Sequence, residues 1–349
     1  MAKRKRRIFS FIFLTILGIG LAVGYYFFRL IYGPVLDIKN DTTAFYIHTG
    51  WDENQVFDAL VSMEIVKKPD ALKWVMNRKN YNGGLVIPGK YILKDGLNAN
   101  DLVDHLRAGN GEVEVSIVLN HARTLQEIAG KASANIEADS ISILDKLTDP
   151  EVMRKYGFTR ETFKAMFLPD TYHTEWDTDA DEFLERMAGE YKKFWTADRI
   201  QKAKNHGLSQ SQVTTLASIV QAEQQTHPQE RPAIAGLYLN RLRKGMRLQS
   251  DPTVVYAVGD FNINRVLTKH LSVESPYNTY KYAGLPPGPI NIPSKQAIDA
   301  VLNAEDNDYI YMCAKADFSG YHAFAKSYNE HLRNARAFQN ALNQRKIYK

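Results

Sequence analysis

The stretch Ser209-Gln-Ser-Gln-Val-Thr-Thr-Leu-Ala-Ser-Ile-Val-Gln-Ala-Glu223 opens the part of the chain around which the other segments are organised. Ser209, followed three residues later by Gln212, has the spacing of a capping box and predicts the start of a helix. Apolar residues then recur at helical spacing and define a buried stripe, namely Val213, Leu216, Ala217 and Val220. One turn further, the same stripe reaches Glu223. The pattern therefore predicts a carboxyl group where a buried apolar side chain would otherwise stand.

Glu223 is the candidate catalytic residue on this helix. Burial disfavours the ionised form of a carboxyl group, so we expect the pKa of Glu223 to exceed that of a surface glutamate. A general acid that works near neutral pH needs such a raised pKa. The helix also ends shortly before Pro228, and a glutamate at a helix end can reach water past the last turn. The spacing alone leaves both interpretations open.

The composition predicts a large folded body behind a basic N-terminal tail. The chain has 349 residues, of which 44% are apolar, which is enough for a sizeable core and predicts two or more domains. Its net charge of +5 equals the five positive charges of Lys3-Arg-Lys-Arg-Arg7. The rest of the chain is therefore balanced, and its charge does not indicate a nucleic-acid partner.

An uncharged apolar run, Ile8 to Phe28, follows the basic tail. As a helix of about 21 residues it would be roughly 31 Å long, enough to cross a lipid bilayer. The run ends in aromatic residues instead of the small residues of a signal-peptide cleavage site. By the positive-inside rule, residues 1–7 stay in the cytoplasm. We therefore predict a single-pass protein of the inner (cytoplasmic) membrane whose body is extracytoplasmic.

Beyond this anchor the pattern predicts an α+β protein. We place a linker at residues 29–43, a small α/β module at 44–110 and a larger mixed α/β domain at 111–349. The small module has the pattern of strand, helix, helix, strand and helix, at Ala44–His48, Asp52–Met63, Pro69–Met76, Gly89–Leu93 and Asn98–Arg107. It is either a spacer or a weak glycan-binding module, and the pattern does not decide between them.

The larger domain combines helices with a few short strands. A second central helix follows Pro228, ends at Gly245 and carries Asn240 and Arg241 beside its apolar stripe. We expect a tight turn at Phe167–Tyr172. The other elements expected are strands at Glu112–Asn120, Tyr309–Ala314 and Tyr321–Phe324 and helices at Thr124–Ala132 and Glu330–Leu342.

Two further segments have the polar and aromatic character of a groove. Met246–Pro252 is expected to be extended, which places Arg247, Gln249 and Asp251 on one face as a site wall or an ordinary solvated face. Gly284–Pro293 is rich in proline, which lacks a backbone donor, so we expect a stiff, extended loop on the surface. The tyrosines that could stack on the sugars of an extended polymer there are Tyr277, Tyr280 and Tyr282.

The sequence has no pattern typical of metal or cofactor binding. Cys313 is the only cysteine, so the body folds without disulfides, and we expect this side chain to pack in the core rather than act as a nucleophile. Cysteine and histidine show no metal-ligand spacing, and the sequence has no glycine-rich phosphate loop. We therefore expect neither a metal nor an organic cofactor.

Several separate segments, taken in order, carry a resemblance to a known family. They are Phe167-Leu-Pro-Asp-Thr-Tyr172, Ala217-Ser-Ile-Val-x-x-Glu223, Glu230-Arg231, Leu239-Asn-Arg-Leu242, Met246-Arg-Leu-Gln-Ser-Asp-Pro-Thr-Val-Val-Tyr256, Tyr277-Asn-Thr-Tyr280, Gly284-Leu-Pro-Pro-Gly288 and His322-x-Phe324. Together they resemble the YceG-like family of endolytic murein transglycosylases, membrane-anchored enzymes that cleave nascent peptidoglycan glycan strands. The chain departs from the family at Gln221, where a glutamate is frequent, and at Leu332, where an asparagine is common.

The resemblance implies a lytic transglycosylase that needs no cofactor. Its catalytic glutamate falls at Glu223, and the small module is LysM-like. The implied reaction cleaves the β-1,4 bond between N-acetylmuramic acid and N-acetylglucosamine, leaves a 1,6-anhydro end and helps to terminate glycan elongation. The implied partners are peptidoglycan glycan strands and peptidoglycan synthases. The residues that we expect to position the sugar are Asn240, Arg241, Gln249, Asp251, Tyr277 and Asn278.

Two alternative functions stay open. A peptidoglycan hydrolase, or muramidase, generally uses two carboxylates, and Asp251 or Glu230 could supply the second one. A non-catalytic glycan-binding scaffold of the cell-wall machinery would bind strands without cleaving them. The products separate the three functions, since they are anhydro ends, reducing ends formed with water, or uncleaved strands.

Overall fold

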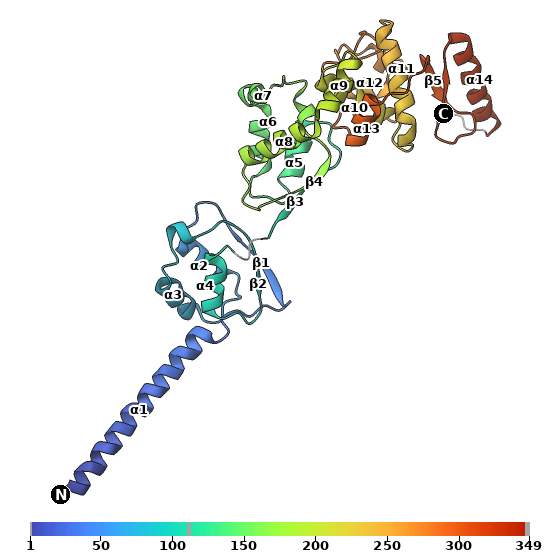
Figure 1. The fold of residues 1–349 in the computed structure, drawn as a ribbon. Coiled ribbons are helices and arrows are strands. Elements are labelled where there is room, and N and C mark those ends of the chain that lie inside the picture. Colours follow the sequence, from blue (N-terminus) through green and yellow to red (C-terminus); the bar gives the residue numbers. More distant parts are fainter. Residues whose placement is uncertain (1, 110–112, 346–349) are drawn as a thin grey trace. The chain divides into compact units, whose positions relative to one another are not determined.

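The computed structural model describes residues 2–109 and 113–345 (Figure 1). The chain divides into two compact units. Unit 1 contains Met1–Ser116, Asn135–Glu137 and His173–Thr178, and unit 2 contains Ile117–Ala134, Ala138–Tyr172 and Asp179–Lys349. The start of a strand expected at Glu112 and the two ends of the chain, residues 1 and 346–349, lie outside the described residues. Both units contain helices and strands, which confirms the mixed class of helices and strands.

Helix α1, Ala2–Tyr32, contains the apolar run. Its segment Ile8–Tyr32 has 25 residues and a mean hydropathy of 2.2, so it is long and apolar enough to cross a membrane. The segment is exposed instead of packed in a core, which distinguishes it from the interior helix of a globular domain. The helix thus extends beyond the expected limit at Phe28. Its orientation across a membrane remains a prediction.

The remainder of unit 1 has the expected order of strand, helix, helix, strand and helix. Strand β1, Thr42–Ile47, pairs antiparallel with β2, Gly89–Lys94. The other elements are α2 Glu53–Ser62, α3 Pro69–Arg78, the 3-10 turn η1 Gly83–Leu85 and α4 Ala99–Arg107. One core joins the strands and the helices, and its buried side chains include Phe45, Leu60, Leu72, Tyr91 and Leu102.

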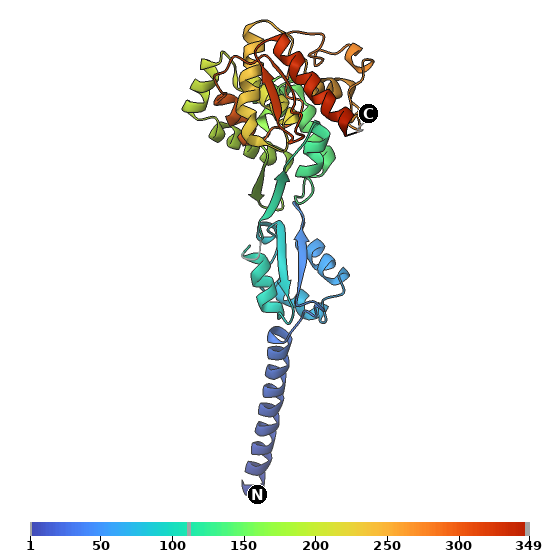
Figure 2. The same cartoon turned by 90° about the vertical axis from the view of Figure 1, so that its right-hand side faces the viewer.

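The larger unit is mainly helical. Its helices are α5 Leu125–Ala132, α6 Ser140–Thr148, α7 Pro150–Lys155, α8 Ala180–Phe194, α9 Ala197–Asn205, α10 Gln210–Glu223, α11 Arg231–Arg243, α12 Asp251–Val258, α13 Lys295–Leu302 and α14 Tyr328–Gln344, with 3-10 turns η2 Phe163–Met166, η3 Pro228–Glu230 and η4 His270–Ser272. The remaining strands form the two-stranded sheets β3–β4 and β5–β6 and are β3 Val115–Leu119, β4 Asp170–Thr174, β5 Tyr311–Ala314 and β6 His322–Ala325. Residues 115–116 of β3 and 173–174 of β4 belong to unit 1. Helix α14 packs beside the β5–β6 hairpin (Figure 2).

Helix α10 lies at the centre of unit 2 and has the predicted boundaries. Ser209 caps its N-terminus: the Ser209 hydroxyl accepts from Gln212 N at 3.2 Å, and Gln212 Oε1 accepts from Ser209 N at 2.8 Å. The helix packs against α9, α11, α12 and α13. Its apolar stripe is fully buried, and this burial fixes the position of the C-terminal turn that carries Glu223.

Two short segments differ from the expected local structure. Residues 246–250 form a loop instead of a strand, because Gln249 adopts a left-handed backbone with φ of 51° and α12 already begins at Asp251. The alternation that would place Arg247, Gln249 and Asp251 on one face is therefore absent. At Phe167–Tyr172 the chain is extended rather than tightly turned, and β4 begins at Asp170.

The second half of the proline-rich loop lies in the interior of unit 2 and not on its surface, whereas Pro287 in the first half is exposed as expected. Residues 288–293 are buried although they form neither helix nor strand. The interior supplies acceptors for the few backbone donors that remain: Ile290 N donates to Ser218 Oγ at 3.1 Å, and Ile292 N donates to Ala122 O at 2.8 Å. Gly288 is required by close packing, since a Cβ there would lie 1.9 Å from Glu161 O.

Candidate active site

A cavity of about 240 Å³ lies at the C-terminal end of α10 in unit 2. Its wall combines residues from α10, α11, the loop before α12 and the β5–β6 hairpin. The lining residues are Glu223, Leu237, Tyr238, Arg241, Leu248, Gln249, Asp251, Tyr280, Met312, Cys313, Ala314 and His322. Three of the substrate residues predicted from sequence, Arg241, Gln249 and Asp251, therefore share one cavity with Glu223.

The Glu223 carboxyl group is held by two hydroxyl groups. Tyr238 Oη on α11 donates to Glu223 Oε1 at 2.8 Å, and Ser250 Oγ donates to the same oxygen at 2.5 Å. Ser250 is fully buried just before α12, and Tyr238 is 2% exposed. Both donors are neutral. The two hydroxyl groups thus fix the orientation of the carboxyl group.

The environment raises the pKa of Glu223 above its ordinary value. Burial is the largest cause, and the negative charge of Asp251 adds to it. The hydrogen bonds from Ser250 and Tyr238 and the proximity of His322 act in the opposite direction but do not cancel the effect of burial. Burial also raises the pKa of Tyr238 well above its usual range, so this phenol stays a donor. Glu223 thus stands half-buried at the end of the predicted helix, and the direction of its pKa shift agrees with the expectation from sequence.

Arg241 fixes the wall of the cavity opposite α10. The side chain is 7% exposed, its Nε donates to Ile310 O at 2.6 Å, and its Nη1 donates to Leu248 O at 2.8 Å. These bonds tie α11 to the residue before strand β5 and to the loop before α12. Gln249 stands on that loop, and its Oε1 lies 3.4 Å from Arg241 Nη1.

Asp251 is exposed at the start of α12 and faces the same cavity. Its Oδ1 accepts from Tyr280 Oη at 2.6 Å. The cavity therefore contains two carboxyl groups in different surroundings, Glu223 half-buried among hydroxyl donors and Asp251 in contact with water. The burial that raises the pKa of Glu223 suits a general acid, and the exposed Asp251 carboxylate lies in the same cavity.

Both asparagines that were predicted to position the sugar instead hydrogen-bond to the protein's own backbone. Asn240 Nδ2 donates to Asn307 O at 2.7 Å and to Tyr309 O at 3.0 Å. Asn278 is fully buried, and its Nδ2 donates to Leu271 O and Val273 O at 3.0 and 2.9 Å. The structure does not bring these two side chains to the cavity that contains Glu223.

Tyr277 also lies outside the residues that line the Glu223 cavity. Its ring packs on Tyr256, with 4.7 Å between the centroids. Cys313 differs from the expectation of a core residue, because it is half-buried and lines the cavity from β5. Burial raises the pKa of its thiol, which disfavours the reactive thiolate.

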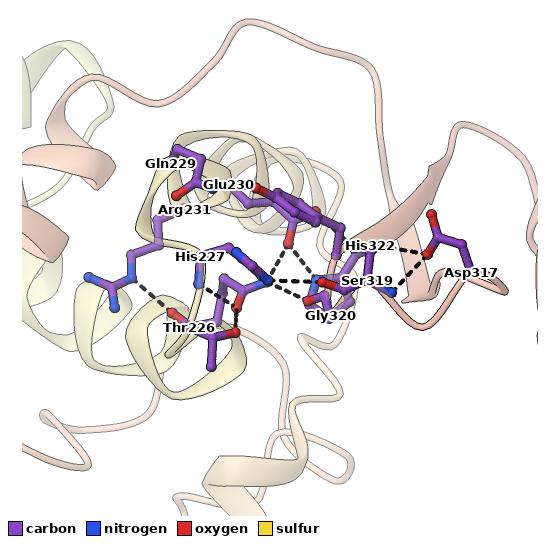
Figure 3. Close-up of polar contacts among 11 residues, drawn as sticks. Thr226, His227, Gln229, Glu230, Arg231, Asp317, Ser319, Gly320 and His322 are labelled. Carbon is purple, nitrogen blue, oxygen red and sulfur yellow. Dashed lines mark hydrogen bonds and ion pairs between the residues drawn. The ribbon is translucent and has the colours of Figure 1, made fainter.

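A second carboxylate network supports one side of the cavity (Figure 3). Glu230 Oε1 accepts from the backbone N of His322 at 2.8 Å. Glu230 Oε2 lies 2.8 Å from His322 Nδ1 and accepts from Gln224 Nε2 at 2.6 Å. Glu230 thereby joins the turn after α10 to strand β6 and orients the His322 ring, which lines the cavity.

Sequence periodicity did not identify the partners of Glu223. Tyr238 stands in the apolar stripe of α11, where periodicity assigns it only to packing. A buried tyrosine hydroxyl needs a hydrogen-bond partner, and that rule could have linked Tyr238 to a buried carboxyl group. Ser250 is a short polar residue before Asp-Pro, and no signal in its local sequence marks it as a ligand of Glu223.

Comparison with known proteins identifies the family. The YceG-like family matches residues 45–337, which is most of the chain. The chain belongs to the YceG-like family. A crystal structure of a YceG-like protein from Listeria monocytogenes has the same fold, with a TM-score of 0.54 and 25% identity over 84% of this chain and 99% of that one. The family expected from the sequence motifs is thus confirmed.

Relatives of this YceG-like chain include enzymes with a stated activity. A protein from Bacillus subtilis named endolytic murein transglycosylase is 27% identical over 89% of both chains. A protein of the same name from Streptococcus pneumoniae is 25% identical. The alignment covers 92% of this chain and 63% of the pneumococcal protein. These names agree with the expected enzyme class, a lytic transglycosylase.

Proposed function

We propose that this YceG-like protein is an endolytic peptidoglycan lytic transglycosylase that uses Glu223 as its acid and base. One observation carries the proposal: a half-buried carboxyl group with a raised pKa lies in a cavity and is oriented by two neutral hydroxyl donors. The glycan strand of peptidoglycan is the substrate, and the scissile bond is the β-1,4 bond between N-acetylmuramic acid and N-acetylglucosamine.

The reaction needs one carboxyl group that first loses and then regains a proton. Protonated Glu223 donates its proton to the glycosidic oxygen as the bond to the anomeric carbon breaks. The Glu223 carboxylate then accepts the proton of the muramic acid 6-hydroxyl, and that oxygen bonds to the anomeric carbon. The product has a 1,6-anhydro end, no water is consumed, and Glu223 is protonated again.

The surroundings of Glu223 fit both halves of this cycle. Burial favours the protonated form before cleavage. After proton transfer, the hydrogen bonds from Tyr238 and Ser250 stabilise the carboxylate. The positive charge that develops at the anomeric carbon is stabilised mainly by the N-acetyl group of the substrate. Of the six positioning residues expected from sequence, we retain Arg241, Gln249 and Asp251 as those that face the sugar.

The same proposal includes the location of the protein. Ile8–Tyr32 anchors it in the cytoplasmic membrane, with the basic residues 3–7 inside and the chain after Tyr32 outside. The β–α–α–β–α module of unit 1 is LysM-like. The protein cleaves nascent glycan strands beside peptidoglycan synthases, and this cleavage terminates the elongation of the strands. The proposal is supported by the exposed apolar helix, the order of elements in unit 1 and the family membership.

Analysis of the products tests the proposed reaction. The full chain in detergent is incubated with purified peptidoglycan, and the released fragments are identified by mass spectrometry. We expect 1,6-anhydro ends inside formerly continuous strands, and no such ends with Glu223→Gln. Release of anhydro ends by Glu223→Gln at the rate of the unchanged protein would contradict the role of Glu223.

Asp251 supports a second candidate function, a muramidase. Its carboxyl group lines the cavity that contains Glu223 and could activate a water molecule, as the second carboxylate of a glycosidase does. Digestion in ¹⁸O-labelled water separates the two reactions. A muramidase leaves reducing ends that contain one ¹⁸O atom, whereas the transglycosylase leaves anhydro ends without the label.

A further inference from the structure

A second and larger cavity adjoins the proposed catalytic cavity within unit 2. Its volume is about 710 Å³. Ala222 lines it directly before Glu223 in α10, and Pro252 lines it directly after Asp251 in α12. The two cavities therefore lie on either side of a shared wall.

The charged side chains of this wall are all basic. Arg123 and Arg231 supply guanidinium groups, and none of the described residues that line the cavity is an aspartate or a glutamate. The wall also contains side-chain amides, among them Gln221 and Gln225 of the α10 end. Such a surface suits a ligand that combines anionic groups with peptide or amide groups.

Arg231 is the most unusual of these residues. It is 5% exposed, and within the described residues its hydrogen bond runs from Nε to Gln224 O at 2.9 Å. Burial alone lowers the pKa of its guanidinium, so no carboxylate in the described part of the chain offsets the burial. In Figure 3 its terminal nitrogens point away from Glu230 and His322. A buried guanidinium of this kind is stabilised when an anion binds to its free edge.

Arg123 adds a second cation at a different part of the wall. Its guanidinium lies over the ring of Phe261, with 4.7 Å between Cζ and the ring centroid. The neighbouring carboxylate of Glu127 accepts from the backbone N of Arg123 at 2.9 Å. Behind the wall, Lys164 Nζ donates to Tyr256 Oη at 2.7 Å and to Arg123 O at 2.8 Å.

We propose that this cavity binds a carboxylate of the stem peptide carried by the muramic acid whose bond Glu223 cleaves. The inference rests on the proposed function. The reaction takes place at the anomeric carbon of muramic acid, and that same sugar carries the peptide through its lactyl group. A peptide attached to a sugar beside Glu223 must leave the catalytic cavity, and the second cavity adjoins it. Guanidinium groups bind peptide carboxylates, and the glutamine amides pair with peptide groups.

Binding of two strand types tests this inference apart from cleavage. The full chain with Glu223→Gln, in detergent, is titrated with glycan strands that carry peptides and with strands from which an amidase has removed them. We expect the peptide-bearing strands to bind roughly tenfold more tightly, since each charge-assisted contact contributes about 1.5 kcal/mol or more. Adding Arg231→Gln or Arg123→Gln should bring this ratio towards one. The matched control is Arg160→Gln, an exposed arginine outside both cavities, which should leave the ratio unchanged.

Several outcomes would overturn the inference. They are an affinity ratio of one between the two strand types in the Glu223→Gln chain, an unchanged ratio in the arginine variants, or an equal loss of affinity for both strand types.

Competition separates a carboxylate site from a phosphate site. Free stem peptide should displace peptide-bearing strands, and displacement by inorganic phosphate alone contradicts the proposal. Arg123→Gln serves as the second variant if Arg231→Gln does not fold, because Arg123 is partly exposed. Cleavage by the chain that retains Glu223 is measured separately, so a failure of the proposed function is distinguishable from a failure of this inference.

Discussion

Glu223 ends α10 and Glu230 ends η3, so the two glutamates stand on opposite sides of one short turn. Glu230 is 8% exposed, and both of its oxygens are engaged, by the backbone N and Nδ1 of His322 and by the Gln224 amide. Glu223 has two hydroxyl donors, and both bind the same oxygen, Oε1. The fold therefore binds both oxygens of the Glu230 carboxyl group. It binds only one oxygen of the Glu223 carboxyl group, which lies beside a cavity.

This difference separates a structural carboxylate from a candidate acid. A carboxyl group whose two oxygens both accept hydrogen bonds from the fold has no free position for a substrate proton. A carboxyl group that is buried among neutral hydroxyls can keep or release a proton at modest cost. The surroundings, rather than the residue type, assign the acid role to Glu223 and the supporting role to Glu230.

The sharpest test of this comparison is a pair of matched substitutions. Glu223→Gln removes the acid and should reduce cleavage of peptidoglycan by at least roughly 10²–10⁴-fold, the usual contribution of a general acid or base. The melting temperature should stay close to that of the unchanged protein, because glutamine can still accept the hydrogen bonds of Tyr238 and Ser250. If Glu223→Gln lowered the melting temperature so far that unfolding explains the lost cleavage, this result would contradict the assignment of Glu223 as the acid.

Glu230→Gln should have the opposite profile. It weakens the bonds to His322 and Gln224, and hydrogen bonds to charged groups contribute about 1.5–3 kcal/mol each. We expect a clear loss in the free energy of unfolding, measured by denaturant titration, and a smaller loss of cleavage than with Glu223→Gln. If Glu230→Gln abolished cleavage at full stability, Glu230 would be the second catalytic carboxylate and the muramidase interpretation would gain support.

Lys164 extends the comparison to a buried cation with neutral partners. It is 5% exposed, and burial lowers its pKa to about 7. Above pH 7 the unfolded chain still binds the proton that the folded protein has released, so this residue makes the free energy of unfolding rise with pH by up to about 1.4 kcal/mol per unit. Lys164→Met should remove this contribution between about pH 7 and 10. Denaturant titrations at several pH values measure it, and the exposed Lys193→Met is the control. Equal slopes in the unchanged protein and Lys164→Met would show that Lys164 is charged in the fold.

The smallest effect concerns the pH profile of cleavage. Activity needs protonated Glu223, so it falls as pH rises through the pKa of that residue. The charge of Asp251 raises this pKa and the Ser250 hydroxyl lowers it. Asp251→Asn should therefore move the alkaline limb of the pH–rate profile to lower pH, and Ser250→Ala should move it to higher pH. A shift in the same direction for both variants would show that another group controls the limb.

The regular elements could be predicted from the sequence because their signals are local. The helices α10 and α11 and the strands β1 and β2 follow from periodicity, capping and proline or glycine positions. The left-handed backbone at Gln249, whose N donates to Thr279 O, and the burial of residues 288–293 could not be predicted, since each depends on distant partners. The buried loop depends on Ser218 and Ala122 as acceptors, and neither is marked in its own sequence as a partner of the loop.

The candidate active site likewise combines a residue that the sequence could locate with contacts that it could not. The position of Glu223 continues an apolar stripe, so periodicity could locate it. Its donors Tyr238 and Ser250 are brought together by the packing of α10, α11 and α12, which no local pattern describes. Asn240 and Asn278 have the polar character of sugar-binding residues but satisfy backbone carbonyl groups in the interior. Residue type alone does not distinguish these two uses of an amide.

The pKa of the Glu223 carboxyl group is the most direct measurement of the central claim. Infrared difference spectra of the full chain and Glu223→Gln, recorded across a pH series, isolate the signal of this one carboxyl group. We predict that it stays protonated well above the ordinary pKa of glutamate, about 4.3. A signal that ionises at or below that value would contradict the assignment of Glu223 as the acid.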